Sequence, residues 1–168
     1  MATSTTKTLD DLFLDTLKDI YFAEKQILKA LPKMARAAQS EEGKAGFLRH
    51  RDETQAQIER LDQVFELLGK PARGKTCEAI QGIIAEGEEI MEEFKGSPAL
   101  DAGLISSAQA VEHYEIARYG TLIAWANQLG LKDAVPLLQA NLAEELATDK
   151  KLTQLAQASA NAKGKRAA

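Results

Sequence analysis

The stretch QAVEHYEIARYG, residues 109–120, determines how the rest of the chain is interpreted. Counting from Ala108 in alternate steps of four and three residues reaches Glu112, Glu115 and Tyr119, which share one face of an expected helix. Apolar side chains normally occupy such a face, yet two of these residues are carboxylic acids. An ionised carboxylate in a protein interior is costly unless it is paired, hydrogen-bonded or bound to a metal. The stretch therefore predicts a polar site inside a helical bundle.

The same anomaly recurs on three other expected helices. Glu24 falls between isoleucines in the apolar stripe of the first helix. On the second helix His50 occupies a core position, and Glu53 lies about 60° away around the helix axis. Two acids, Glu145 and Asp149, replace core residues on the last helix. A single acid of this kind can be an exposed residue at the edge of the core, but its recurrence on four helices favours a shared site.

Composition indicates one all-α domain in a chain of 168 residues, with 45% hydrophobic and only 5% aromatic residues. The formal net charge of −4 argues against a nucleic-acid groove, so a nucleic-acid partner is not expected. Cys77 is the only cysteine, which excludes an internal disulfide and fits a reducing compartment. No secretion signal or membrane-spanning stretch is evident. These features predict a cytoplasmic protein that does not enter membranes.

Periodicity and helix-end signals predict four long helices and one short helix. Pro32 falls inside the first long helix and predicts either a kink or the end of that helix; we favour a kinked, continuous helix. The short helix, capped by Thr76, connects the second and third long helices. The domain is expected over residues 1–158, followed by a flexible basic tail over 159–168. The expected long helices cover residues 9–38, 42–68, 100–129 and 132–158.

Four long helices with one long crossover have the connectivity of ferritin-like proteins, in which inward carboxylates and histidines assemble a two-metal site. Oxygen ligands with few imidazoles suit iron or manganese. We therefore expect two iron ions, or two manganese ions, to compensate the buried acids. The candidate metal ligands are Glu24, His50, Glu53, Glu112, Glu115, Glu145 and Asp149.

Four sequence segments, taken together, resemble the YciE/YciF family of ferritin-like bacterial stress proteins. They are DIYFAEKQ at 19–26, HRDET at 50–54, EHYE at 112–115 and EELATD at 144–149. The resemblance extends from residue 9 to about residue 158. It implies a five-helix ferritin-like domain, a homodimer and a rubrerythrin-like dinuclear site.

The pattern of rubrerythrins is matched only in part. Glu24 takes the place of their single first-helix Glu, and Glu112 and Glu115 match their Glu-x-x-Glu. Glu53 matches the second-helix Glu, but the His expected three residues later is Ala56, so His50 would supply the imidazole. On the last helix Asp149 stands where rubrerythrins have histidine. A site with so little nitrogen is expected to be harder and more anionic.

Several residues around this set remain open to more than one interpretation. Glu144 competes with Glu145 as a ligand, because a shift of one residue turns a helical side chain by about 100°. Tyr119 and Gln57 are candidates to hydrogen-bond the ligands. His113 lies off the ligand face and is interpreted as making a surface or interhelical hydrogen bond.

The function that these residues favour is that of a stress-related metal protein that handles peroxide or dioxygen, or that oxidises iron. Glu53 and Glu145 are expected to bridge or chelate the ions, with His50 as the nitrogen ligand. Whether the site is catalytic stays open. The alternative is a non-enzymatic ferritin-like scaffold that acts through dimerisation or partner binding. A role in protecting DNA rests only on the basic tail and is the weakest of the three.

Overall fold

The computed structural model describes residues 6–165. Within that range the chain is almost entirely helical, which confirms the all-α prediction. A π-helical segment, Ala156–Ala160, and a final short helix, α6 (Asn161–Gly164), complete the fold. The main helices are α1 (Leu9–Ala37), α2 (Glu41–Leu67), α3 (Glu78–Glu93), α4 (Leu100–Gln128) and α5 (Ala134–Leu155).

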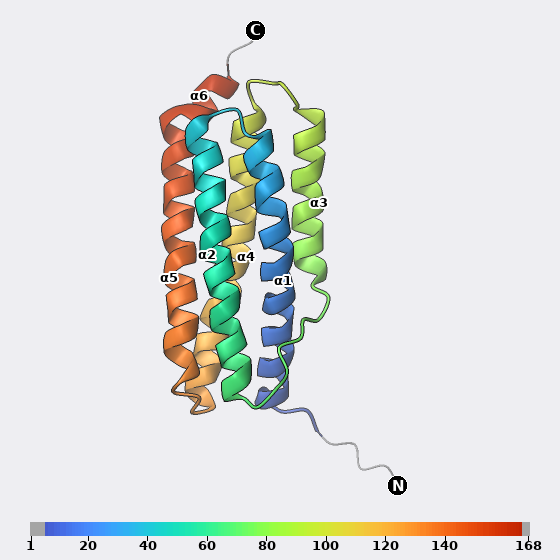
Figure 1. Cartoon of the computed structure of the whole chain (residues 1–168), viewed down its shortest axis with the longest axis vertical. Helices are drawn as coiled ribbons and strands as arrows, with labels where there is room; N and C mark the ends of the chain where they lie inside the picture. The colour runs from blue at the N-terminus through green and yellow to red at the C-terminus, as the bar shows by residue number, and fades with distance from the viewer. Residues whose placement is uncertain (1–5, 166–168) are drawn as a thin grey trace.

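Figure 1 shows α1, α2, α4 and α5 side by side as a bundle, with α3 packed outside α1 and α4. In this view α1 rises from the N-terminal end and α2 descends beside it. The crossover that contains α3 returns the chain to the upper end, so α4 also descends and α5 rises. Helices α2 and α4 consequently run in the same direction. This is the ferritin-like four-helix bundle with an additional short crossover helix that the sequence predicted.

The core of the bundle follows the expected stripes. Leu17, Ile20 and Ile27 of α1 and Leu61 and Val64 of α2 are buried. Each is spaced by three or seven residues from the next on its own helix, so apolar side chains line the inner faces and drive the helices together. Polar residues interrupt these stripes over the middle of the bundle, and that interruption contains the candidate site.

The turn between α1 and α2 is held by residues from two directions. Helix α1 continues through Pro32, as we favoured, and ends at Ala37. Ser40 caps α2 by accepting a hydrogen bond from the N–H of Gly43. Asp101 at the start of α4 accepts hydrogen bonds from the N–H groups of Gln39 and Ser40, at 2.7 and 2.9 Å. The first turn of α4 therefore fixes the top of the α1–α2 pair.

The crossover is anchored to α1 before α3 begins. Lys75 donates its backbone N–H to the carbonyl of Lys18, and its ammonium pairs with Asp15 at 2.7 Å. The N-cap of α3 is Cys77 rather than the predicted Thr76. The Cys77 sulfur accepts from the N–H of Ile80 and also contacts the hydroxyl of Tyr114 on α4, at 3.0 Å. This buried thiol therefore has a structural role as a cap.

The C-terminal end differs from the expected frayed segment. The helical path continues beyond residue 158 through the π-helical segment and α6 to Gly164. Ala160 is buried, so this extension packs on the domain instead of leaving it. Lys163 and Lys165 lie in the described part of the expected basic tail, whereas Arg166 lies outside it. None of the helices in residues 6–165 is long and apolar enough to cross a membrane.

Candidate metal centre

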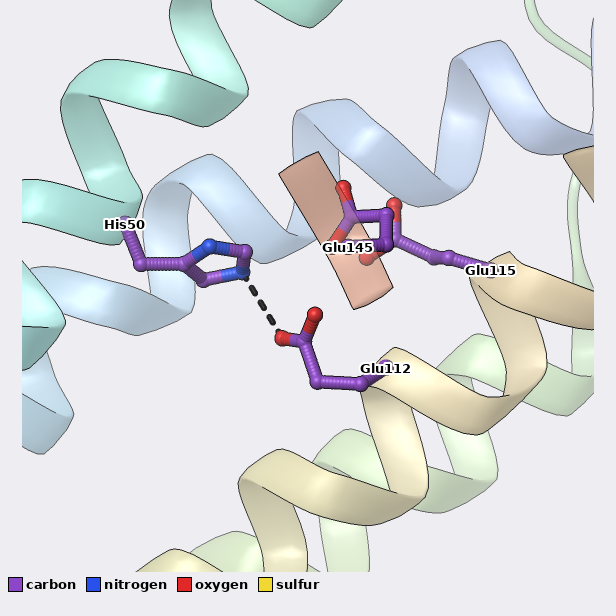
Figure 2. Close-up of side chains that lie close together, drawn as sticks. All are labelled: His50, Glu112, Glu115 and Glu145. Atoms are coloured by element: carbon purple, nitrogen blue, oxygen red, sulfur yellow. Dashed lines mark ion pairs between the residues drawn. The ribbon is translucent and has the colours of Figure 1, made fainter. Parts of the chain in front are cut away.

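Four side chains from three helices converge inside the bundle, as Figure 2 shows. They are His50 of α2, Glu112 and Glu115 of α4, and Glu145 of α5. One potential ligand atom from each lies within 4.8 Å of the corresponding atoms of the other three. All four residues are buried, with exposed fractions of 4% for His50 and 0–1% for the acids. The spacing is suitable for a shared cation.

Helical periodicity explains why the acids of α4 face inward. Ala108, Glu112, Glu115 and Tyr119 follow one another on the same face, and all four are buried. Adjacent positions of α4 that leave this face, such as His113 and Ala117, are exposed. The backbone of a regular helix therefore directs Glu112 and Glu115 into the interior, despite the cost of burying them.

Glu24 of α1 borders this cluster and is itself completely buried. Tyr119 donates its phenolic hydrogen to Oε1 of Glu24. The second carboxyl oxygen of Glu24 has no hydrogen-bond partner within the described residues. Burial is the largest cause of the raised pKa of Glu115, and the charge of Glu24 raises that pKa further. The first helix thus adds a fourth acid to the site.

Unsatisfied oxygens are the main physical feature of the centre. In the part of the chain that the structure describes, neither carboxyl oxygen of Glu112, Glu115 or Glu145 has a hydrogen-bond partner. Ionised carboxylates only accept hydrogen bonds, so neighbouring acids cannot satisfy one another unless a proton or a cation lies between them. Buried polar atoms without partners are rare in native proteins. The donor set therefore fits a hard cation, which such oxygens bind well.

Protonation is the other way to accommodate these acids. Burial raises the pKa of Glu24 to about 7, with Tyr119 and neighbouring charges modifying that effect. Burial is also the largest cause of the raised pKa values of Glu115 and Glu145, and the neighbouring acids raise them further. Without a cation, part of the cluster is therefore held as neutral carboxylic acid at neutral pH.

His50 is placed between two acids. Its Nε2 lies 3.0 Å from Oε1 of Glu112, and its Nδ1 lies 3.7 Å from Oε2 of Glu53. The contact with Glu112 is an ion pair and not a hydrogen bond, so both ring nitrogens are without a hydrogen-bond partner among the described residues. Burial lowers the pKa of His50, but the two carboxylates outweigh it and raise that pKa to about 10. The imidazole is consequently cationic when no metal displaces its proton.

Glu53 and Asp149, both candidate ligands, lie at the margin of the cluster. Glu53 is partly exposed and accepts a hydrogen bond from Thr148 at 3.2 Å. Interaction with His50 is the largest cause of its lowered pKa. Asp149 is directed toward Gln109 and His113 of α4, with contacts of 3.2 Å to each. The structure therefore brings Glu53 beside His50 but does not bring Asp149 into the compact group.

The neighbouring acids Glu144 and Glu145 have different environments. Glu145 faces the cluster, whereas Glu144 forms a two-pronged ion pair with Arg60 at 2.7 and 2.9 Å. Gln57 donates to Glu144 at 3.1 Å and so supports this pair rather than a cluster acid. His113, for which a surface or interhelical hydrogen bond was predicted, is exposed and lies 3.2 Å from Asp149 of α5 through its Nε2. Within the structure, Glu145 is the acid of this pair that can share a cation with the other helices.

Sequence reasoning missed Asn141 and Thr148. Asn141 is completely buried and donates to the Tyr119 hydroxyl at 3.1 Å, while its own oxygen accepts from Arg60 at 2.9 Å. Thr148 holds Glu53. Both residues lie on the inner face of α5, at spacings of four and three residues from Glu145, so the same stripe pattern could have included them.

This arrangement defines a class: a ferritin-like helical bundle with a buried carboxylate–histidine cluster. Comparisons with known proteins identify the family of the chain. The profile of the family described as "Domain of unknown function (DUF892)" matches residues 8–165. Protein YciF of Escherichia coli strain K12 is 48% identical over 151 residues, covering 89% of this chain and 91% of YciF.

Solved structures extend the comparison. The crystal structure of the E. coli stress protein YciF superposes with a TM-score of 0.88 at 46% identity, covering 93% of this chain and 99% of that chain. YcfI of Rhodopseudomonas palustris gives a TM-score of 0.85 at 51% identity, with coverages of 91% and 98%. A Xanthomonas campestris protein shares the fold alone, at 22% identity and a TM-score of 0.70. The chain belongs to the YciE/YciF family of ferritin-like bacterial stress proteins, DUF892.

Proposed function

We propose that the cluster binds two divalent transition-metal ions, iron or manganese, and that the loaded protein reacts with peroxide or dioxygen or oxidises iron. The observation that carries this proposal is the set of buried carboxyl oxygens without hydrogen-bond partners in the described chain, on Glu112, Glu115 and Glu145. Cations would compensate their mutual repulsion. A stress-related role is supported by the relation to E. coli YciF, which is described as a stress protein.

Each residue would have a distinct part in holding the ions. His50, Glu112, Glu115 and Glu145 have the separations that one shared ion requires. Glu24, beside Glu115, would contribute to the second ion. Glu53 would join through its position beside His50, as a bridge or a chelating group. Asp149 would have to turn away from Gln109 and His113 before it could bind.

When bound, such a pair of ions supplies open coordination positions and two one-electron transfers. The chain itself supplies orientation and shielding. Tyr119 fixes one oxygen of Glu24, and Thr148 fixes one oxygen of Glu53. The complete burial of Glu24, Glu115 and Glu145 keeps bulk water from these carboxylates. These contacts would preserve the ligand geometry while the charge of the site changes.

Elemental analysis of protein purified without chelator tests the metal proposal. We expect about two equivalents of iron or manganese per chain, because inward Glu and His side chains of ferritin-like bundles typically assemble a two-metal site. Glu112→Ala should abolish binding of one or both ions. The loaded protein should then be mixed with hydrogen peroxide and its consumption followed. If metal-free protein binds neither iron nor manganese on reconstitution, the proposal is wrong.

A non-enzymatic scaffold is the second candidate. It is favoured by the raised pKa values of Glu24, Glu115 and Glu145, since protonation lets the interior hold these acids without metal. The relative YcfI is itself described as a proposed structural protein. This candidate predicts that Glu112→Ala leaves metal content near zero and stability unchanged or raised. We propose that the chain is a homodimer under either function, which sedimentation of the purified protein measures.

A further inference from the structure

A cavity of about 460 Å³ lies between α2 and α5, beside the metal centre. Its volume falls within the range of about 300–1,000 Å³ that is typical of small-molecule sites. Apolar atoms make up most of its surface. Its walls include Phe47, Ala108, Leu152 and Leu155, and its lining also includes His50 and Glu53. The cavity is partly open to solvent and places two candidate ligands beside an apolar wall.

The polar side of the cavity carries unused hydrogen-bonding capacity. His50 is 4% exposed, and both of its ring nitrogens are buried, so neither presents a donor to the cavity. Glu53 beside it is partly exposed and accepts only one hydrogen bond, from Thr148, within residues 6–165. This side of the cavity therefore offers one acceptor, the carboxylate of Glu53.

We propose that this cavity binds a small organic molecule with an apolar body and one neutral hydroxyl or hydroperoxyl group, which makes organic hydroperoxides the substrate class. A hydroxyl or hydroperoxyl group carries one O–H donor, so it can donate a hydrogen bond to the carboxylate of Glu53. An anionic head group would instead face the carboxylate of Glu53 at short range. The rim carries one acid, Glu42, and two bases, Arg49 and Lys151, so the repulsion of an anion comes from Glu53 on the polar side of the cavity and not from the rim.

The substrate assignment rests on the proposed peroxide chemistry, whereas the binding of a neutral alcohol does not. Reduction of a hydroperoxide breaks its O–O bond with two electrons and two protons and yields an alcohol and water. The proposed pair of divalent metal ions supplies the two electrons, one from each ion, and solvent supplies the protons. The alcohol product has the same body and a hydroxyl end, so it is a non-reactive probe of the same cavity.

Gly46 provides a way to fill the cavity. It lies in the lining, and a Cβ placed on it meets no atom within 4 Å. Gly46→Phe should therefore enter open space, and the loss of a glycine from a helix interior favours α2. Gly82 of α3 is a matched control, because its Cβ also meets nothing within 4 Å and it is not part of the lining.

The first experiment measures binding of 2-phenyl-2-propanol to metal-free protein by ligand-observed NMR. We expect the wild type and Gly82→Phe to bind it and Gly46→Phe to bind at least about tenfold more weakly. Ala158→Trp, at an exposed lining position, gives a second blocking variant if Gly46→Phe does not fold. Absence of binding to the wild type, or equal binding by both blocking variants, would overturn the cavity proposal.

The second experiment compares cumene hydroperoxide with hydrogen peroxide on metal-loaded protein. We expect Gly46→Phe to slow consumption of cumene hydroperoxide at least about tenfold while hydrogen peroxide consumption is maintained, because only the bulky substrate needs the chamber. If Gly46→Phe slows the consumption of both peroxides equally, the result would contradict the substrate assignment. The blocking variants could bind 2-phenyl-2-propanol more weakly while neither the wild type nor any variant consumes either peroxide. That result would support the cavity as a binding site and contradict the proposed peroxide function.

Discussion

Tyr119 of α4 donates a hydrogen bond to Glu24 of α1, and both side chains have an exposed fraction of 0%. Asn141 of α5 donates to the same phenolic oxygen, so three of the four bundle helices meet at this hydroxyl. The contact satisfies one of the two oxygens of Glu24 and leaves the other free for a cation. Tyr119 thereby positions an acid of the candidate metal centre.

Tyr119→Phe should lower both stability and metal affinity. The change removes the donor to Glu24 and the acceptor for Asn141 while keeping the ring, so we expect a loss of about 1–3 kcal/mol in the free energy of unfolding. Metal affinity should fall by about 10–100-fold, as for the loss of other groups that orient a ligand. Urea denaturation of metal-free protein and metal titration measure the two effects.

Tyr21 provides the matched control for that substitution. Its hydroxyl donates to Asp62 of α2 at 2.8 Å, an acid outside the cluster. Tyr21→Phe should cost stability without changing metal affinity. Equal effects of the two substitutions on metal affinity would contradict a positioning role for Tyr119.

Much of the fold follows from the amino-acid sequence because its signals are local. The stripes, the glycines after helices and the crossover length placed the four long helices to within a few residues at most ends. The errors lie where tertiary contacts decide. Cys77 instead of Thr76 caps α3, because its sulfur is also held against Tyr114. The helical extension after residue 158 packs on the bundle through Ala160, a contact that composition does not indicate.

For the site, periodicity identified the inward acids but not their exact convergence. Four helical residues turn about 400°, so Asp149 lies about 40° around α5 from Glu145 and reaches Gln109 of α4 instead of the cluster. The pairing of Glu144 with Arg60 depends on the position of α2 relative to α5, which no local pattern specifies. The inward direction of these acids is therefore predictable from sequence, whereas their partners across helices require the packed structure.

Glu145→Gln and Glu144→Gln should separate the roles of two adjacent acids. Glu145 has no hydrogen-bond partner in the described range and faces the cluster, so its replacement should weaken metal binding at least about tenfold. Glu144 is paired with Arg60 near the surface, so its replacement should cost about 1 kcal/mol of stability and leave metal binding intact. Metal titration and thermal unfolding measure both variants. Retained affinity in Glu145→Gln would contradict its assignment as a ligand.

Asp101→Ala should destabilise the upper end of the bundle. Its carboxylate accepts hydrogen bonds from the N–H groups of Gln39 and Ser40 between α1 and α2. Removing a charged acceptor of two backbone donors should lower the free energy of unfolding by about 1–3 kcal/mol. Asp101→Asn, which keeps one acceptor oxygen, should lose less. Chemical denaturation measures the difference, and equal losses would show that the paired acceptance is unimportant.

Metal-free protein should lose stability as pH rises from about 5 to about 9. The pKa of Glu24 rises from 4.5 to about 7 on folding, so its contribution is complete below 4.5 and disappears as pH approaches 7. The pKa of His50 rises from 6.5 to about 10, so its contribution disappears between those values. In both cases the folded state binds the proton more tightly than the unfolded state, so both groups lower the free energy of unfolding as pH rises.

Metal-loaded protein should instead gain stability as pH rises over the lower part of the range from about 5 to about 9. Metal ions compete with protons for Glu24 and His50, so raising the pH strengthens metal binding and the stability that depends on it. Denaturant midpoints at matched pH values, with and without a stoichiometric excess of manganese, measure the two slopes. Metal-free protein whose stability increases steadily toward pH 9 would show that these buried groups are not protonated as the geometry requires. Parallel slopes with and without manganese would show instead that the ion binds elsewhere.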